Sequence, residues 1–396
     1  MMAAGTAAAR GRHVILLEKN KRLGEKLRIT GGGRCNITNN EPDLRKLLAR
    51  YGKAEQALYS AYSKFGVKET FEFFTSRGLP LKTEAKGRSF PETEKALDVE
   101  KVLEKYCADS KVTILTNSAV EKILEKDGKI IGVISRGITY QSDSVILSTG
   151  GKSHPETGST GDGFNWLKSL DHTVAAHSPS IVPISVEEAW IKSMAGITAP
   201  LVKINFFLDG KKSFSKSGNI LFTHFGLSGP TILNSAKNIG DLLHEGVVTG
   251  TIDVYPKKDF NILEQEILAL FDANKNKTFK NLCKNFVPAG MSAGILSLLS
   301  ITLSEKKVHS VTKEERKTII HLLKALPFTI IGLMGFDRAV VADGGIDITE
   351  VDMRTMQSKK YKNLYVTGDL LNINRPTGGF SLQLCWTTGY IAGLNA

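Results

Sequence analysis

Three short apolar runs, one near each end of the chain and one in its middle, constrain the fold most strongly. The runs are His13–Leu17, Ser144–Leu147 and Asn363–Thr367. They are continuous rather than alternating, which is typical of strands buried on both faces of a parallel sheet. The last two run directly into Thr149-Gly150-Gly151 and Gly368-Asp369, where the chain must turn sharply. The pattern predicts an α/β domain with ligand-contacting turns at the ends of its strands.

The first run ends in Glu18 and follows an Ala-rich segment, Met2–Arg10, that favours a helix. In a dinucleotide-binding βαβ unit, an acidic residue at this place accepts hydrogen bonds from ribose hydroxyls. The complete unit also has a strand and a G-x-G-x-x-G loop before the helix, and neither stands before Met2. Two interpretations stay open: the chain is an N-terminally shortened version of a longer protein, or the dinucleotide interpretation is wrong.

A second signal is the glycine loop, which we define as Gly31–Gly33. Arg28 and Arg34 frame it, and Asn36 follows. Consecutive glycines let backbone N–H groups approach a phosphate closely, and Arg34 adds charged donors. A plain flexible loop is the alternative, but the framing by arginines favours ligand contact.

Gly378 and Gly379 precede a predicted helix from about Phe380 to Leu394. The unpaired N–H groups and the positive dipole at the start of a helix form an anion site. Glycines also permit close packing of a helix on a strand, so this position alone does not decide between the two roles. The combination of strand, Gly-Asp and Gly-Gly-helix in one segment favours cofactor contact.

The middle of the chain differs in character from both ends. Val202–Leu208, Asn219–Thr223 and Val247–Val254 are rich in β-branched and aromatic residues and predict a small antiparallel sheet or barrel. From about Asp259 to Leu323 the apolar residues follow a helical period, which predicts a helical insert within the β-domain.

Composition limits the class of partner. Lys+Arg number 52 against 40 Asp+Glu, a net charge of +12, which favours anionic partners. The lysines are scattered rather than gathered in one run, so we do not expect a dedicated nucleic-acid role. No apolar stretch approaches the ~20 residues of a membrane span. The four cysteines are far apart and show no metal-ligand spacing, so we expect no metal, no disulfide framework and a cytoplasmic location.

Taken together, the motifs resemble those of the NAD(P)/FAD-dependent flavoprotein family that includes aminoacetone oxidase and the BaiN-like bile-acid reductases. The match runs in order from residue 2 to the end of the chain. The residues that carry it are Leu17–Lys19, Gly24, Thr30–Asn36, Gly87–Pro91, Thr149–Gly151, Gly161–Gly163, Thr223–Pro230, Gly344-Gly345, Gly368-Asp369 and Pro376–Phe380.

The resemblance implies a glutathione-reductase-like, FAD-binding Rossmann domain with an inserted β-barrel-like domain and a small helical insert. The expected boundaries are 1–181 and 338–396 for the FAD domain, 182–256 and 325–337 for the barrel, and 257–324 for the insert. Relative to the family, the chain would be truncated at its start by one strand and the pyrophosphate loop. Weak retention of FAD is the expected consequence.

The resemblance also implies roles for single residues. Glu18 would bind the adenosine ribose, Val120 would meet adenine through its backbone, and Asp369 would contact the ribityl or pyrophosphate region. The predicted cofactor-binding residues are Glu18, Lys19, Gly31, Gly32, Gly33, Arg34, Cys35, Asn36, Val120, Thr149, Gly150, Gly151, Gly368, Asp369, Gly378, Gly379 and Phe380. His224 and Arg375 are the candidates for catalytic contact with substrate, with His154 a weaker one.

The predicted function is therefore FAD-dependent two-electron oxidation or reduction of a small organic substrate, with NAD(P)H or oxygen as the second electron partner. No separate nicotinamide-binding glycine motif is visible. Two alternatives stay open: a flavin-dependent enzyme that modifies nucleic acid or an RNA-binding protein, and a non-catalytic flavin-binding protein. The sequence does not decide the substrate or the oligomeric state.

Overall fold

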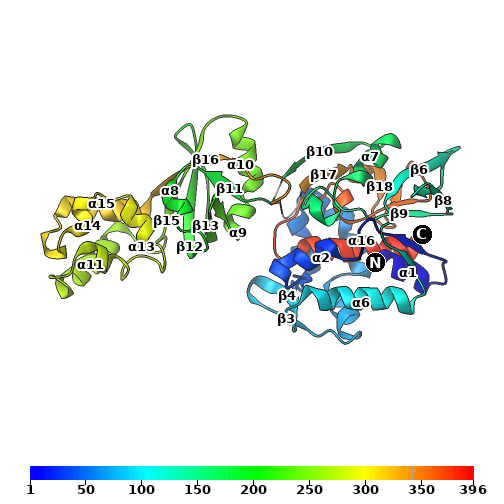
Figure 1. Ribbon diagram of the computed structural model, residues 1–396, viewed down its shortest axis with the longest axis horizontal. Helices are drawn as coiled ribbons and strands as arrows, with labels where there is room; N and C mark the ends of the chain where they lie inside the picture. The colour runs from blue at the N-terminus through cyan, green and yellow to red at the C-terminus, as the bar shows by residue number, and fades with distance from the viewer. Residues whose placement is uncertain (180, 340–341) are drawn as a thin grey trace. The chain divides into compact units, whose positions relative to one another are not determined.

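A computed structural model describes residues 1–179, 181–339 and 342–396 and divides the chain into two compact units (Figure 1). Unit 1 comprises Met1–Ser178 and Val340–Ala396, so it is assembled from both ends of the chain. Unit 2 comprises Pro179–Ala339. Each unit has its own hydrophobic core, as expected for segments long enough to bury one.

Unit 1 contains the three apolar runs as parallel strands. β1 (Ile15–Leu17) pairs in parallel with β5 (Thr113–Leu115), and β20 (Leu364–Val366) pairs in parallel with β9 (Val145–Leu147). Two short antiparallel strands, β18 (Val351–Asp352) and β19 (Gln357–Ser358), extend the second sheet in the order β18-β19-β20-β9. The predicted α/β Rossmann character is confirmed, with short strands that carry glycine turns at their carboxyl ends.

The helices at the two ends of the chain, α1 (Met2–Ala9) and α16 (Phe380–Asn395), lie side by side (Figure 1). Small residues make this approach possible, because a Cβ atom at Gly393 would lie only 2.4 Å from the carbonyl oxygen of Ala3. α6 (Ala96–Asp109) packs against α1 as well. Unit 1 also contains other helices and sheets. They are α2 (Glu25–Ile29), α3 (Leu44–Leu48), α4 (Glu55–Lys64), α5 (Val67–Thr75), α7 (Asp162–Ser169), the sheet of β2 (Thr38–Asn39), β4 (Arg88–Pro91) and β3 (Leu81–Thr83), the sheet of β6 (Val120–Lys126), β7 (Lys129–Ser135) and β8 (Ile138–Gln141), and the pair β10 (Val174–Pro179) and β17 (Ala342–Ile346).

Unit 2 is built on a closed barrel in the order β11-β14-β13-β12-β15-β16. Its strands are β11 (Ile184–Val186), β12 (Thr198–Leu208), β13 (Lys211–Thr223), β14 (Gly226–Ser228), β15 (Val248–Asp253) and β16 (Leu326–Leu333). Closure leaves no free sheet edge, and inward side chains such as Ile204, Phe206 and Phe222 are fully buried. The predicted barrel is confirmed.

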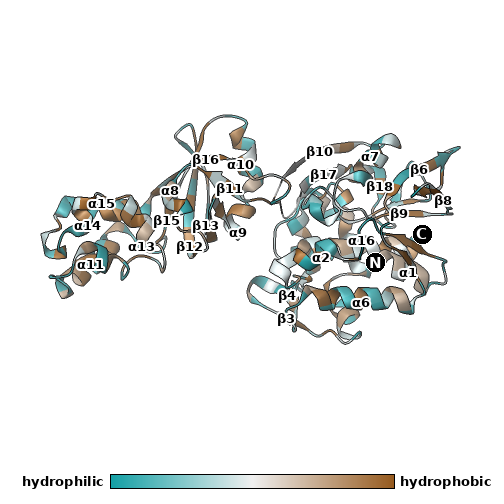
Figure 2. Ribbon diagram, viewed as in Figure 1, coloured by the Kyte–Doolittle hydropathy of each residue, from teal (hydrophilic) through white to brown (hydrophobic). Residues whose placement is uncertain are grey.

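Between β15 and β16 the chain forms a group of helices. They are α11 (Phe260–Ala273), α12 (Phe279–Cys283), α13 (Ser292–Ser297), α14 (Ile301–Glu305) and α15 (Lys313–Lys324). Figure 2 shows hydrophilic and hydrophobic residues alternating along α11 and α15, and Leu263, Ile267 and Phe271 are the buried residues of α11. None of the helices in the described part of the chain is long and apolar enough to cross a membrane.

A buried polar network in unit 1 joins two segments that are far apart in the sequence, one containing His172 and the other containing Glu350 and Ser358. The fully buried imidazole of His172 lies 2.6 Å through Nδ1 from Glu350 and 3.0 Å through Nε2 from the hydroxyl of Ser358. Ser358 Oγ also accepts the backbone N–H groups of Lys360 and Tyr361. The network thereby fixes the β18 (Val351–Asp352) and β19 (Gln357–Ser358) hairpin to the segment between α7 and β10.

The network predicts a loss of stability in acid. Burial raises the pKa of Glu350, but hydrogen bonds from Thr173 and His172 and the ammonium of Lys360 lower it to about 2. A depressed folded-state pKa contributes stability that is present above the unfolded value, 4.5, and is lost as pH falls towards 2. We expect Glu350→Gln to lower the free energy of unfolding at neutral pH by about 1–2 kcal/mol, with the difference vanishing near pH 2.

Urea unfolding at several pH values measures this difference. Glu72→Gln, at a glutamate that is mostly exposed, is the control and should follow the wild type throughout. If the free energy of unfolding of Glu350→Gln stays below that of the wild type by the same amount in acid, the charge of the Glu350 carboxylate is not the cause of the difference.

Candidate functional site

The carboxyl ends of β9 and β20 lie at one edge of their parallel sheet, and the predicted cofactor turns lie there. Ser148, after β9, and Thr367, after β20, are joined by a hydrogen bond of 2.9 Å between their hydroxyl oxygens. A Cβ atom at Gly151 would lie 3.5 Å from the Cβ of Asp369. The structure therefore brings together the Thr149–Gly151 turn and the Gly368-Asp369 turn, which were predicted separately.

The end of β1 reaches the loop that follows β9. The Lys19 ammonium lies 2.7 Å from the carboxylate of Asp162, the first residue of α7. Glu18 accepts the backbone N–H of Asn20 at 2.8 Å, and Asn20 donates through its side chain to Thr157 O. Glu18 and Lys19 thus lie beside the loop between β9 and α7, which contains Gly150.

A cluster of charges surrounds Asp369. Its carboxylate forms ion pairs with the guanidinium of Arg375 and, at 3.7 Å, with the ammonium of Lys26. Burial raises the pKa of the Asp369 carboxyl, but the two cations lower it by more. The pKa of this carboxyl therefore lies below its usual value. Lys26 also donates to Ser153 Oγ at 2.6 Å. Lys26 and Arg375 thus bring two cations to the Gly368-Asp369 turn, where Asp343 also acts on Arg375.

The start of α16 is packed so closely that only glycine fits. Gly379 has φ of 103°, and a Cβ atom there would lie 2.3 Å from the carbonyl carbon of Thr38. The amide of Asn36, oriented so that both of its ends are satisfied, accepts the N–H of Gly379 at 3.0 Å, and Asn39 donates to Gly378 O at 3.0 Å. Gly378 and Gly379 are therefore held in place by the segment that directly follows the glycine loop.

Two buried tyrosines support the same turn. Tyr51 donates to the carbonyl of Phe380 at 2.8 Å, and Tyr62 donates to Tyr51 at 2.5 Å. Burial raises the pKa of Tyr51 well above its usual value, so this phenol stays protonated and remains a donor. The sequence analysis missed both tyrosines, because 329 residues separate Tyr51 from Phe380.

The glycine loop forms a tight turn after α2. Gly31, Gly32 and Gly33 all have positive φ. A Cβ atom at Gly31 would lie 2.9 Å from the backbone nitrogen of Asn36. Arg28, before the loop, pairs at 2.5 Å with Glu100 of α6, a residue that is only 1% exposed.

Arg34, which was predicted to donate to a phosphate, is paired with carboxylates of the protein instead. Its guanidinium forms ion pairs with Glu84 and, at 3.0 Å, with Glu94, and it stacks 4.1 Å from the ring centroid of Phe90. Both carboxylates belong to the region of β3 and β4. Contact of Arg34 with a cofactor phosphate stays a prediction, and it would have to compete with these two partners.

Of the remaining predicted residues, Arg375 belongs to the charge cluster around Asp369, Val120 lies in β6 and His224 lies in unit 2. Val120 begins β6 and is half-buried. Arg375 is buried, and all three of its nitrogens are engaged, by Ser381, by Ile373 O and by Asp369. His224 lies exposed in unit 2, between β13 and β14, with its ring 4.9 Å from that of Phe225. The contacts of Arg375 favour a positioning role, whereas the exposure of His224 leaves it accessible to a substrate.

The cysteines of the site are predicted to be unreactive. Burial raises the pKa of Cys35 and of Cys385 to about 12, and the carboxylate of Asp369 adds to the effect at Cys385. Only thiolates react readily, so at about pH 8 we expect less than one thiol per folded chain to react with Ellman's reagent. In guanidinium chloride all four should react. Rapid labelling of the folded protein that disappears in Cys385→Ser would contradict the prediction.

The residues at this edge fit a flavin dinucleotide. A Cβ atom at Gly31 or Gly379 would meet backbone atoms, the cations Lys26 and Arg375 lie beside Asp369, and a buried sixteen-residue helix begins after Gly379. Across the described ranges, no group of three or more His, Cys, Asp or Glu residues could hold a metal ion. Fold and site together define an FAD-binding Rossmann-type oxidoreductase.

Comparison with known proteins specifies the family. Residues 1–395 match the family described as the HI0933-like protein Rossmann domain, and the chain belongs to this family. The 3-dehydro-bile acid delta(4,6)-reductase of Clostridium scindens is 29% identical over 98% of this chain and 95% of the relative. The ribosomal RNA dihydrouridine synthase of Haemophilus influenzae is 24% identical over 100% of this chain and 95% of its own length. The ribosomal RNA dihydrouridine synthase of Escherichia coli is 25% identical over 98% of this chain and 93% of its own length. The predicted family and the prediction of an FAD-dependent oxidoreductase are confirmed.

Solved structures support the fold. A 3-ketosteroid-delta4-(5alpha)-dehydrogenase from Rhodococcus jostii matches with a TM-score of 0.53 at 15% identity, over 100% of this chain and 94% of that protein. A flavocytochrome c3 fumarate reductase matches with a TM-score of 0.52 at 15% identity, over 100% of this chain and 75% of that protein. At such identities the likeness concerns the fold alone.

Proposed function

We propose that this chain uses FAD to reduce a carbon–carbon double bond conjugated to a carbonyl group, with NAD(P)H as the electron donor. The names of both kinds of curated relative point to one chemistry: a delta(4,6)-reductase acts on double bonds, and dihydrouridine is uridine with two hydrogens added. Both activities add a pair of hydrogens across an activated double bond.

The start of α16 is the observation that carries the proposal. When bound, FAD would supply the two-electron transfer. The residues Gly378–Phe380 would lie beside the flavin ring, and the positive end of the helix would stabilise negative charge there by about 0.3–1 kcal/mol, or more when partly buried. Asn36, Asn39 and Tyr51 hold this turn from three sides, so the helix end is rigid before a ligand arrives.

Other residues of the site would bind and orient. The cluster of Lys26, Asp369 and Arg375 would position the ribityl and pyrophosphate part of the cofactor, and Glu18 would hold the ribose. His224 is proposed as a substrate contact because it is an exposed polar side chain on the barrel. His224→Ala is then expected to raise KM for the substrate while leaving the reduction of the flavin by NAD(P)H unchanged.

Anaerobic flavin spectroscopy tests the proposal. The chain is loaded with FAD, reduced with NADPH or NADH, and mixed with an unsaturated 3-oxo steroid acid, with each step followed by flavin absorbance. We expect a nicotinamide to bleach the flavin and the enone to restore its colour with one saturated product per flavin. Return of the flavin colour on addition of oxygen but not of the enone would overturn the reductase proposal in favour of an oxidase.

A second substrate class, a uridine ring within RNA, has support from the two dihydrouridine synthases that match nearly the whole chain. The same experiment with uridine-containing RNA distinguishes the two substrates. Reoxidation by RNA with formation of dihydrouridine, and none by the enone, would favour this candidate.

A further inference from the structure

The tip of the β3–β4 hairpin lies beside the start of α16. The side-chain amide of Asn39 donates both to Lys86 O and to Gly378 O, each at 3.0 Å. The backbone N–H of Asn40 donates to the next carbonyl of the tip, that of Gly87, at 2.6 Å. The end of β2 therefore joins the hairpin tip directly to the turn that is proposed to lie beside the flavin ring.

The hairpin, residues 81–91, carries three cationic side chains, and two of them are paired with carboxylates. Lys82 forms an ion pair with Glu94, and Arg88 lies 3.6 Å from Glu84. The third is Lys86, whose side chain is exposed and forms no ion pair with any residue in the described ranges. The tip thus carries one cation that has no carboxylate partner in the described part of the chain.

The backbone of Lys86 adopts a conformation that lysine rarely takes. Its φ is 63°, in the left-handed region that glycine and asparagine tolerate best. Lys111, in the turn between α6 and β5, has nearly the same φ, 61°. The conformation alone therefore assigns no role to Lys86. What distinguishes the two lysines is that Lys86 lies beside Gly378.

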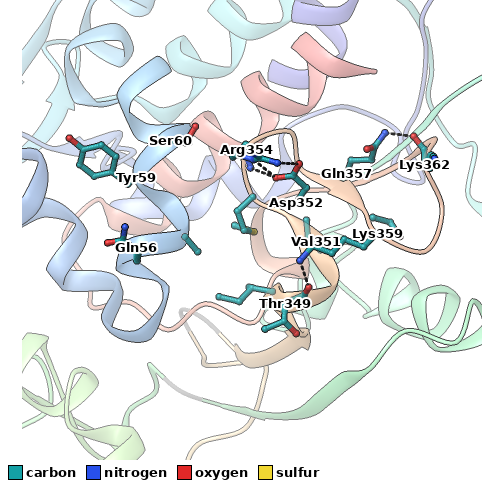
Figure 3. Close-up of a pocket in the computed structure, with 14 residues that line it drawn as sticks. Gln56, Tyr59, Ser60, Thr349, Val351, Asp352, Arg354, Gln357, Lys359 and Lys362 are labelled. Carbon is teal, nitrogen blue, oxygen red and sulfur yellow. Dashed lines mark hydrogen bonds and ion pairs between the residues drawn. The ribbon is translucent and has the colours of Figure 1, made fainter.

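A second group of cations lies at a groove of about 740 Å³ between α4 and the β18–β19 hairpin (Figure 3). Figure 3 shows Arg354 paired with Asp352 in this groove. The hydrogen bond from Arg354 and the nearby ammonium of Lys359 lower the pKa of the Asp352 carboxyl below its usual value. Because these cations already act on a carboxylate of the protein, they attract an external anion less strongly than Lys86 does.

From these contacts we propose that Lys86 binds a carboxylate group of the substrate and thereby favours anionic over neutral substrates. The proposal rests on the proposed function, because it takes the turn at Gly378 as the place of the flavin ring. One ammonium on a long, flexible side chain matches one negative charge without requiring a fixed bidentate geometry. Complementary charge of this kind contributes mainly to specificity.

Equilibrium dialysis with two ligands that differ by one charge tests the proposal. The ligands are the unsaturated 3-oxo steroid acid and its neutral methyl ester, each dialysed against the full chain in excess FAD without nicotinamide. We expect Lys86→Asn to raise the Kd of the acid about fivefold, the size of an ion pair near a surface, and to leave the Kd of the ester unchanged. Asparagine tolerates the left-handed conformation, so this variant should fold at least as stably as the wild type.

The matched control is Lys111→Asn, which removes the same charge from the same backbone conformation at another exposed turn. Its Kd for the acid should equal that of the wild type. An equal rise in both variants would show diffuse attraction and overturn the proposal. So would an equal rise for acid and ester in Lys86→Asn, or faster release of FAD from this variant with the Kd of the acid unchanged.

The experiment also separates this proposal from the proposed function, since binding is measured without any reduction. Failure of the wild type to bind the acid would overturn the role of Lys86. Binding of the acid through Lys86 without its reduction by NAD(P)H would contradict the proposed function alone.

Discussion

Gly379→Ala is expected to destabilise the protein by about 3–5 kcal/mol and to abolish retention of FAD. Alanine at φ 103° is strained, and its Cβ would lie 2.3 Å from the carbonyl carbon of Thr38 and 2.7 Å from the backbone nitrogen of Asn39. Backbone atoms cannot move aside as a flexible side chain would, so the first turn of α16 must shift. Urea unfolding measures the stability, and flavin fluorescence on dilution measures retention.

Gly32→Ala is the matched control for this prediction. Gly32 also has a positive φ, 69°, but a Cβ atom there meets nothing within 4 Å. The substitution should therefore show the strain alone, about 1–2 kcal/mol. Equal losses in the two variants would mean that backbone conformation, rather than contact with Thr38, makes glycine necessary at Gly379.

The features that could be predicted from sequence are local ones. Val145–Leu147 and Leu364–Val366 are continuous apolar runs, and a glycine turn follows each of them within three residues. Neighbouring residues therefore predict both the strand and the turn at its carboxyl end. Gly378 and Gly379 precede an apolar helix in the same way. The β-branched and aromatic residues of the barrel strands in unit 2 are likewise a local signal.

The partners of these residues could not be predicted, because they come from distant parts of the chain. The sequence suggested Arg34 as a free phosphate donor, whereas Glu84 and Glu94, 50 and 60 residues away, hold its guanidinium. Lys26 meets Asp369 only in the folded chain. Propensity and spacing carry no information on such pairs, which depend on how strands and helices are placed.

The charge of the chain illustrates the same limit. The lysines look scattered in sequence, and Lys359-Lys360 is one pair among several. In the fold, Arg354 pairs with Asp352 and Lys360 lies beside Glu350, so this pair of lysines does not act as free charge. Local pairing, rather than the total of +12, decides where a polyanion could bind.

Arg28→Met is expected to destabilise the protein by about 3–5 kcal/mol. The carboxylate of Glu100 is buried in α6, and its oxygens receive hydrogen bonds of 2.5 and 2.6 Å from Arg28. Removing the guanidinium would leave a buried charge without its partner, which costs far more than the net contribution of the pair. Because Arg28 lies three residues before Gly31, the first residue of the glycine loop, the variant should also weaken FAD binding.

A double-mutant cycle separates charge burial from loss of packing. Glu100→Leu/Arg28→Met removes both charges and should recover most of the stability lost in Arg28→Met, since apolar replacement of a buried pair is often neutral. Lys105→Met, at a pair whose side chains are 75% and 61% exposed, should change the free energy of unfolding by less than about 1 kcal/mol. If Arg28→Met lowered the free energy of unfolding as little as Lys105→Met does, water would have to reach the carboxylate of Glu100. The ion pair between Arg28 and Glu100 would then not be what fixes the glycine loop to α6.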